Sequence, residues 1–133
     1  MNSVFLDSVG LLALWDRADQ WHTDASAAYR LLRAQSSPFV TTTLVFLECG
    51  NAAARRPYRR RVNVFRQALA EENSLIEPSL EDVELAWAAY DRGHANEAGI
   101  VDQVSFAVMQ RLGIMQAFTN DQHFEAAGFE ILF

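Results

Sequence analysis

The chain has 133 residues, half of them hydrophobic, which is enough apolar material for one domain with a buried core. The formal net charge is −6, and all eleven basic residues are arginine. The absence of lysine excludes the Walker A phosphate loop, Schiff-base enzymes, receiver domains and haloacid-dehalogenase-type phosphatases. No apolar run is long enough to cross a membrane, and the single cysteine, Cys49, is expected to be buried in a protein of the reducing cytoplasm.

Apolar runs of strand length alternate with patterns of helical spacing from the start of the chain to residue 76. In chain order, these patterns predict a strand over 4–6, helices over 8–15 and 24–34, a strand over 38–42, helices over 44–54 and 59–72, and a strand over 75–76. Asp7 or Ser8 can cap the first helix, and Thr43 can cap the third.

The same alternation continues to the end of the chain. The patterns predict a helix that opens with a capping box at 79–82 and runs to 91, a helix over 101–112, a strand over 116–119, a short helix over 122–127 and a strand over 129–132. Because strands alternate with helices throughout, we expect a single α/β domain over residues 1–133, with a parallel sheet covered by helices on both faces.

Four acidic residues lie beside apolar segments of this pattern. Asp7 ends the first strand, Asp121 follows the fourth strand, Asp102 opens the clearest amphipathic helix, and Glu48 lies inside an apolar stretch of the helix over 44–54. In open parallel sheets, ligands bind outside the carboxyl ends of the strands. The pattern therefore predicts a site that these acids share.

Each acid also has a simpler interpretation. Asp7 and Asp102 could cap the helices that follow them, and Asp121 could belong to an ordinary turn. Glu48 is harder to explain in this way, because glutamates flanked by apolar residues within a helix are uncommon. A buried carboxylate needs compensation, and no lysine or neighbouring arginine supplies it, so the four acids together favour a divalent cation such as Mg²⁺ or Mn²⁺.

Four segments resemble the four motifs of PIN domains, and they are most similar to those of the toxins of VapBC-type toxin–antitoxin pairs. The segments are Val4-Phe5-Leu6-Asp7-Ser8, Leu44-Val45-Phe46-Leu47-Glu48, the stretch from Val101-Asp102-Gln103 to Met109, and Ala117-Phe118-Thr119-Asn120-Asp121-Gln122-His123-Phe124. The resemblance covers essentially the whole chain. It implies a three-layer sandwich around a parallel sheet of four or five strands.

The resemblance also implies a function: a Mg²⁺- or Mn²⁺-dependent endoribonuclease that hydrolyses RNA phosphodiesters with metal-activated water. Such a toxin is usually a homodimer and is inhibited by a cognate antitoxin protein. Carried over by position, the catalytic and metal-binding acids are Asp7, Glu48, Asp102 and Asp121. Asp7 and Asp102 are the expected direct ligands, and Ser8 and Thr119 are expected to support the acids by hydrogen bonds.

The chain departs from the family pattern at three positions close to these acids. Val9 stands where a small hydroxyl residue is frequent, Gln103 stands where many members have cysteine, and Val101 stands where serine or threonine is common. These differences leave the four acids in place.

A cluster of five arginines lies between the second and third motifs: Arg55, Arg56, Arg59, Arg60 and Arg61. The planar guanidinium groups suit RNA phosphates, and they could equally bind acidic residues of an antitoxin. The three histidines lack the spacing of a zinc site. His123 lies two residues after Asp121 and could approach the substrate, although a surface or packing role is expected. Two other functions remain open from the sequence, a non-catalytic module that binds RNA or protein and a housekeeping RNA-processing nuclease.

Overall fold

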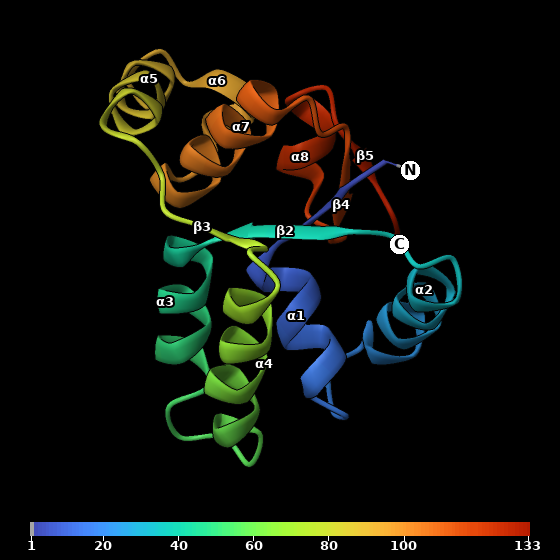
Figure 1. Cartoon of the computed structure of the whole chain (residues 1–133). Coiled ribbons are helices and arrows are strands. Elements are labelled where there is room, and N and C mark those ends of the chain that lie inside the picture. The colour runs from blue at the N-terminus through green and yellow to red at the C-terminus, as the bar shows by residue number, and fades with distance from the viewer. Residues whose placement is uncertain (1) are drawn as a thin grey trace.

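The computed structural model describes residues 2–133 and places a five-stranded sheet at the centre of the molecule (Figure 1). All neighbouring strands are parallel, in the order β3-β2-β1-β4-β5. The strands are β1 (Val4–Leu6), β2 (Phe39–Thr42), β3 (Leu75–Ile76), β4 (Gln116–Phe118) and β5 (Glu130–Ile131). The predicted parallel sheet of four or five strands is confirmed.

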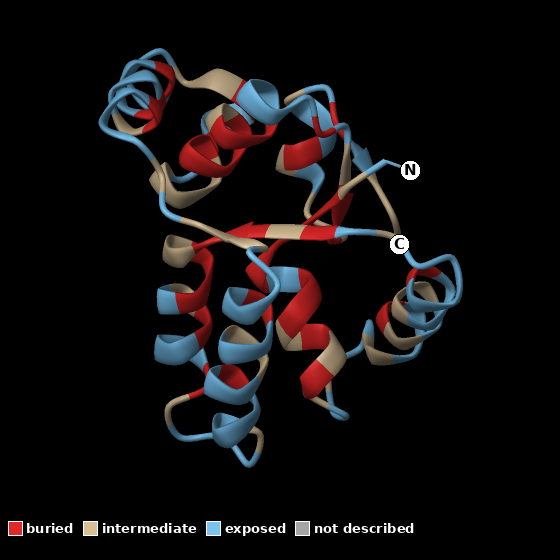
Figure 2. Cartoon of the chain, in the orientation of Figure 1, coloured by how far each residue is buried: buried red, intermediate tan, exposed pale blue. Residues whose placement is uncertain are grey.

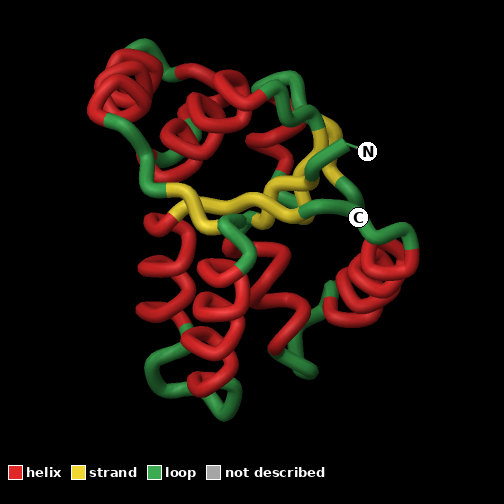
Figure 3. Tube along the Cα trace, viewed as in Figure 1, coloured by secondary structure: helices red, strands yellow, loops and turns green. Residues whose placement is uncertain are grey.

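Helices cover both faces of this sheet. On one face lie α1 (Ser8–Trp15), α3 (Thr43–Ala52) and α4 (Arg59–Glu71), with α2 (His22–Ala34) packed against α1. On the other face lie α5 (Leu80–Asp91), α6 (His94–Glu97), α7 (Ile100–Leu112) and α8 (Gln122–Ala126) (Figure 1). Figure 3 shows the short strands between these two layers. The arrangement is the predicted three-layer sandwich.

The central strands are apolar on both sides, which is typical of a parallel sheet covered by two helical layers. Val4, Phe5 and Leu6 in β1 are all at most 1% exposed, and β1 pairs with β2 on one side and β4 on the other. Buried residues concentrate at the sheet and on the helix surfaces that face it (Figure 2). Because β1 and β4 are parallel neighbours, the residues that follow them lie at the same edge of the sheet.

Gly10 brings α1 close to β4. A Cβ atom at this position would lie 2.1 Å from the backbone oxygen of Phe118 and 2.7 Å from the Phe118 ring. No side chain fits in that space, so only glycine lets the first turns of α1 approach the end of β4 this closely. The residues on either side of this contact, Asp7 and Thr119, belong to the proposed site.

Two details of the helix starts differ from the prediction, and a third agrees with it. Thr42, and not Thr43, caps α3, because its side chain accepts a hydrogen bond from Val45 N–H. Gly99 is the N-cap of α7, so Asp102 lies inside the first turn and does not cap the helix. The capping box at Ser79 is present as predicted.

Helix α6 was not predicted. Cys49 is fully buried, as predicted, and burial raises the pKa of its thiol, which keeps it protonated and unreactive. Among residues 2–133, no helix has both the length and the apolar character needed to cross a membrane.

Candidate active site

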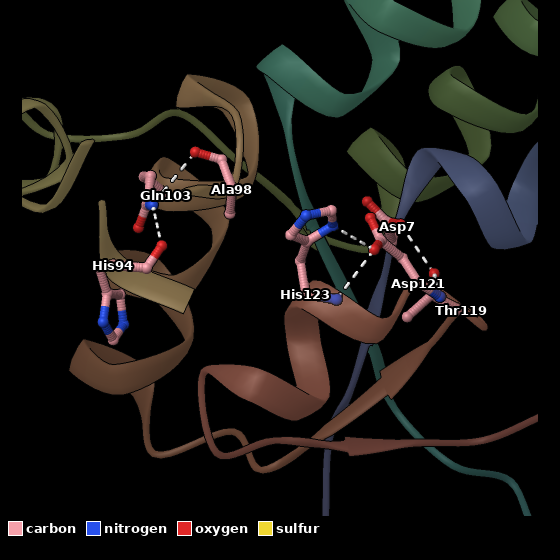
Figure 4. Close-up of polar contacts among 7 residues, drawn as sticks. All are labelled: Asp7, His94, Ala98, Gln103, Thr119, Asp121 and His123. Atoms are coloured by element: carbon pink, nitrogen blue, oxygen red, sulfur yellow. Dashed lines mark hydrogen bonds and ion pairs between the residues drawn. The ribbon is translucent and has the colours of Figure 1, made fainter. Parts of the chain in front are cut away.

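Asp7 lies at the point where β1 passes into α1. It is 1% exposed, and its side chain makes no capping hydrogen bond to α1, so the simple helix-cap interpretation does not account for it. Thr119, directly after β4, donates a hydrogen bond from Oγ1 to Asp7 Oδ2 at 2.9 Å (Figure 4). Among the described residues, Asp7 Oδ1 has no hydrogen-bond partner. One oxygen of a buried carboxylate is therefore held by the neighbouring strand, and the other is free.

Asp121 is the N-cap of α8, and its side chain accepts a hydrogen bond from His123 N–H at 3.0 Å. The backbone N–H of Asp121 donates to Thr119 Oγ1 at 3.1 Å. Thr119 therefore contacts both acids, since it donates to Asp7 and accepts from Asp121. A single buried hydroxyl therefore contacts the carboxylate of Asp7 and the backbone of Asp121, two acids that are far apart in the sequence.

Asp102 reaches the same place from the first turn of α7. Carboxylate oxygens of Asp102 and Asp121 and a ring nitrogen of His123 all lie within 4.8 Å of one another. His123 Nδ1 is 2.7 Å from Asp121 Oδ1, and the His123 side chain is 42% exposed. The structure thus adds His123 to the acids that the sequence singled out.

Glu48 lies on the side of α3 that faces α1. Ser8 Oγ donates a hydrogen bond to Glu48 Oε1 at 2.9 Å, which links the residue after Asp7 to the second motif. The negative charge of Glu48 also acts on Asp102. All four predicted acids are therefore brought to one edge of the sheet, and both predicted supporting residues, Ser8 and Thr119, donate a hydrogen bond to one of them.

The crowding of negative charge changes the acidity of two of these groups. Burial raises the pKa of Asp7 to about 8, and the charges of Asp102 and Asp121 add to this effect, whereas the hydrogen bond from Thr119 opposes it. Burial raises the pKa of Asp102 to about 7, with further contributions from Asp121 and Glu48, and His123 opposes the increase. Without a counter-charge, these acids resist ionisation at neutral pH.

A divalent cation fits this set of side chains. The free Asp7 Oδ1 is a buried carboxylate oxygen, which is costly without a partner. Carboxylate oxygens are the ligands that Mg²⁺ and Mn²⁺ prefer, and a cation among them would favour the ionised forms of Asp7 and Asp102. Asp102, Asp121 and His123 have ligand atoms within 4.8 Å of one another and could hold such an ion. Asp7 and Glu48 lie close enough for their charges to interact with this group.

The arginine cluster lies away from the acidic residues at the sheet edge. Helix α3 leaves the sheet at Thr43, and the segment 53–58 that joins it to α4 is at the far end of both helices (Figure 1). A helix of ten residues is about 15 Å long, so α3 separates the cluster from the sheet edge. Arg60 and Arg61 border an apolar groove of about 500 Å³. Its other lining residues are Leu14, Trp15, Tyr29, Val64, Phe65 and Ala68.

From the sequence, a surface or packing role was expected for His123. A lone histidine without a second histidine at ligand spacing gives no metal signal. The signal that was available is its position two residues after Asp121, where the first turn of a short helix directs both side chains to the same side. The structure shows that Asp121 caps this turn, which is why the two side chains meet.

The fold and this geometry define a class of protein, an α/β protein with a carboxylate site at the carboxyl edge of a parallel sheet. The chain belongs to the PIN domain family, whose model matches residues 4–130. It is 31% identical over 136 aligned positions to the 23S rRNA-specific endonuclease VapC20 of Mycobacterium tuberculosis, in both strain CDC 1551 / Oshkosh and strain H37Rv. The alignment covers 95% of this chain and 95% of each relative.

The structural comparison agrees with the sequence comparison. The crystal structure of Mycobacterium tuberculosis VapC20, described as a sarcin–ricin loop cleaving toxin, superposes with a TM-score of 0.77 at 30% identity and with 95% of each chain covered. The predicted family and its fold are confirmed. These relatives also support the predicted class of activity, an endonuclease that acts on RNA.

Proposed function

We propose that this protein is the toxin of a type II toxin–antitoxin pair and that it hydrolyses RNA in a reaction that requires Mg²⁺ or Mn²⁺. The observation that carries the metal requirement is the free, buried Asp7 Oδ1 beside Asp102 and Asp121. The toxin assignment rests on the VapC20 relatives. The protein acts in the cytoplasm, where ribosomal RNA and an antitoxin are both present.

Each acid has a role in this proposal. Asp7 and Asp102 bind the ion directly, and Asp121 completes the set from the start of α8. Glu48, held by Ser8, binds a second ion or orients a water molecule toward the phosphate. A divalent ion held by these residues would supply an activated water molecule and would offset charge on the scissile phosphate. Thr119 keeps Asp7 and Asp121 in place while the substrate binds.

The substrate is a structured RNA. Because the VapC20 relatives are 23S rRNA-specific and the solved one cleaves the sarcin–ricin loop, an RNA hairpin that contains this loop is the first substrate to test. The relatives are about 30% identical to this chain, so an RNA of different sequence is the necessary second substrate.

The arginine cluster serves the antitoxin in this proposal. Arg60 and Arg61 border an apolar groove on the layer of α1, α2 and α4, away from the acids. Such a groove suits an amphipathic helix with acidic residues at its edge. A small gene beside the gene of this chain, with such a helix in its product, would support the pairing.

The active form is a homodimer. Leu47 on α3 is 65% exposed, and Trp87 and Tyr90 on α5 are 46% and 48% exposed. Apolar side chains of this size are typical of interfaces. Sedimentation at micromolar concentration is expected to show a dimer, and a strict monomer would contradict this part of the proposal.

The test compares two matched variants in an RNA cleavage assay with Mn²⁺. Asp102→Asn should abolish cleavage of the hairpin, because it removes one carboxylate ligand. Asp91→Asn, at an exposed site on α5, should cleave as the wild type does. A non-catalytic RNA-binding module would show no cleavage by the wild type, and an active Asp102→Asn variant would show that the site is assigned wrongly.

A further inference from the structure

Gln103 is a buried polar residue that the proposed chemistry does not use. It follows Asp102 directly in α7, and it is 1% exposed. Its Nε2 donates to the backbone oxygens of His94, at 2.9 Å, and Ala98, at 3.2 Å (Figure 4). Within residues 2–133, its Oε1 has no hydrogen-bond partner. All of the hydrogen bonding of this buried amide therefore goes to two carbonyl groups, one at each end of α6.

Helix α6 has an unusual backbone. Ala95, Asn96 and Glu97 have φ angles of 57°, 57° and 59°, which places three consecutive residues with side chains in the left-handed region. This region is disfavoured for residues with a Cβ atom, and a run of such residues persists only where the surroundings hold it. The two hydrogen bonds from Gln103 span this turn from His94 to Ala98.

The turn is packed against both helices that carry acids of the site. Helix α6 contacts α8, which begins directly after Asp121. The His94 ring meets the Phe106 ring edge-on at 6.3 Å, and Phe106 in α7 meets Phe124 in α8 edge-on at 4.9 Å. Because Ala98 directly precedes the N-cap of α7, a change in the turn would move the starts of both α7 and α8.

We infer that Gln103 is a positioning residue, whose side-chain amide holds the left-handed turn α6 and thereby keeps Asp102 and Asp121 at the spacing that a divalent cation requires. The inference rests on the proposed metal site. A shorter side chain could not reach both ends of the turn from this position.

The main test measures Mn²⁺ binding by calorimetry in the absence of RNA. Gln103→Met keeps the length of the side chain and removes both donors, and it should weaken Mn²⁺ binding by about tenfold, as loss of supporting residues around metal ligands typically does. Gln110→Met makes the same change at an exposed position on α7 and should bind Mn²⁺ as the wild type does.

A second-site variant separates positioning from simple packing. Asn96 and Glu97 are exposed, so Asn96→Gly with Glu97→Gly lowers the cost of the left-handed turn at two of its three positions without removing buried contacts. In the Gln103→Met background, this pair of glycines should recover most of the lost Mn²⁺ affinity, and it should restore folding if Gln103→Met alone does not fold. In the wild-type background, the pair should leave binding unchanged. If the triple variant, Gln103→Met with Asn96→Gly and Glu97→Gly, folds and still binds Mn²⁺ weakly, the inference is overturned.

Nuclear magnetic resonance tests the hydrogen bonds themselves in the wild type. The Gln103 side-chain amide hydrogens should exchange with solvent far more slowly than those of Gln110, and equal rates would overturn the inference. Equal Mn²⁺ affinity of wild type and Gln103→Met would overturn the inference and leave the proposed function standing. A wild type that binds no Mn²⁺ would overturn both.

Discussion

Thr119 Oγ1 donates a 2.9 Å hydrogen bond to Asp7 Oδ2 and joins the ends of two neighbouring parallel strands. The same oxygen accepts from the backbone N–H of Asp121. Among residues 2–133, the second carboxylate oxygen of Asp7 has no hydrogen-bond partner. Thr119 therefore organises two acids from opposite ends of the chain while it leaves one oxygen available to a ligand.

Thr119→Val tests this arrangement. Valine keeps the shape of the side chain and removes the hydroxyl, so Asp7 loses a donor and Asp121 loses an acceptor. We expect Mn²⁺ binding to weaken by about tenfold in calorimetry. Thr41→Val is the matched control, because Thr41 is equally buried at the end of the adjacent strand and its hydroxyl donates to Leu6 O. If both variants bind Mn²⁺ equally, the Thr119 hydroxyl has no special role at the site.

The stability of the metal-free protein should depend on pH through Asp7 and Asp102. Burial raises their pKa values to about 8 and about 7, from the usual value of 3.8. At pH values between the unfolded and folded pKa values, the folded protein binds more protons than the unfolded chain. The free energy of unfolding therefore falls as the pH rises. The stabilisation from these two carboxyl groups is fully present below pH 3.8, their pKa in the unfolded chain. It is lost as the pH rises through 7 to 8, their pKa values in the folded protein.

Thermal melting in excess chelator should therefore show a lower melting temperature at about pH 8.5 than at about pH 6. Asp7→Asn should flatten this dependence and melt higher than the wild type at alkaline pH, whereas Asp91→Asn should follow the wild type. Saturating Mn²⁺ should stabilise the wild type most at alkaline pH, because its ligands must lose their protons. A metal-free wild type that gains stability across this range would contradict the assigned pKa directions.

Gly10→Ala tests the close approach of α1 to β4. The added Cβ would meet the Phe118 backbone oxygen, so α1 must move away from the strand end. We expect a loss of about 1–3 kcal/mol in the free energy of unfolding, with weaker Mn²⁺ binding, because Asp7 and Thr119 lie on either side of this contact. Gly50→Ala, in α3 with open space around it, should instead stabilise by about 0.5–1 kcal/mol. Unchanged Mn²⁺ binding by a folded Gly10→Ala variant would show that the site does not depend on this contact.

The arginine cluster can be tested with RNA alone. If Arg60 and Arg61 serve the antitoxin groove, then Arg60→Gln with Arg61→Gln should leave RNA binding and its salt dependence unchanged when binding is measured in chelator. If these arginines instead contact phosphates, the slope of log affinity against log salt should decrease by about 0.7–0.9 for each lost contact. That decrease would assign the cluster to the RNA.

The acids could be predicted from sequence because each has a local signal. Asp7 and Asp121 follow apolar strands, and Glu48 is flanked by apolar residues that must be buried. In a parallel sheet, the ends of successive strands meet at one edge, so local signals were sufficient to predict a shared site.

The turn α6 had no such signal, and His123 had only its position two residues after Asp121. Non-glycine residues rarely adopt the left-handed conformation, so nothing in Ala95, Asn96 and Glu97 indicated it. The turn depends on hydrogen bonds from Gln103, which is a tertiary effect. His123 likewise gained its position from the cap at Asp121, which only the folded chain reveals.

The central claim is that the chain hydrolyses RNA with a metal-activated water molecule. The most direct measurement is mass spectrometry of the ends of an RNA hairpin after incubation with the protein, first in excess chelator and then with Mn²⁺ restored. We expect no cleavage in chelator and, with Mn²⁺, fragments that carry a 5′-phosphate and a 3′-hydroxyl, because water and not the ribose 2′-hydroxyl attacks the phosphate. Cleavage that persists in chelator, or a 2′,3′-cyclic phosphate product, would contradict the account.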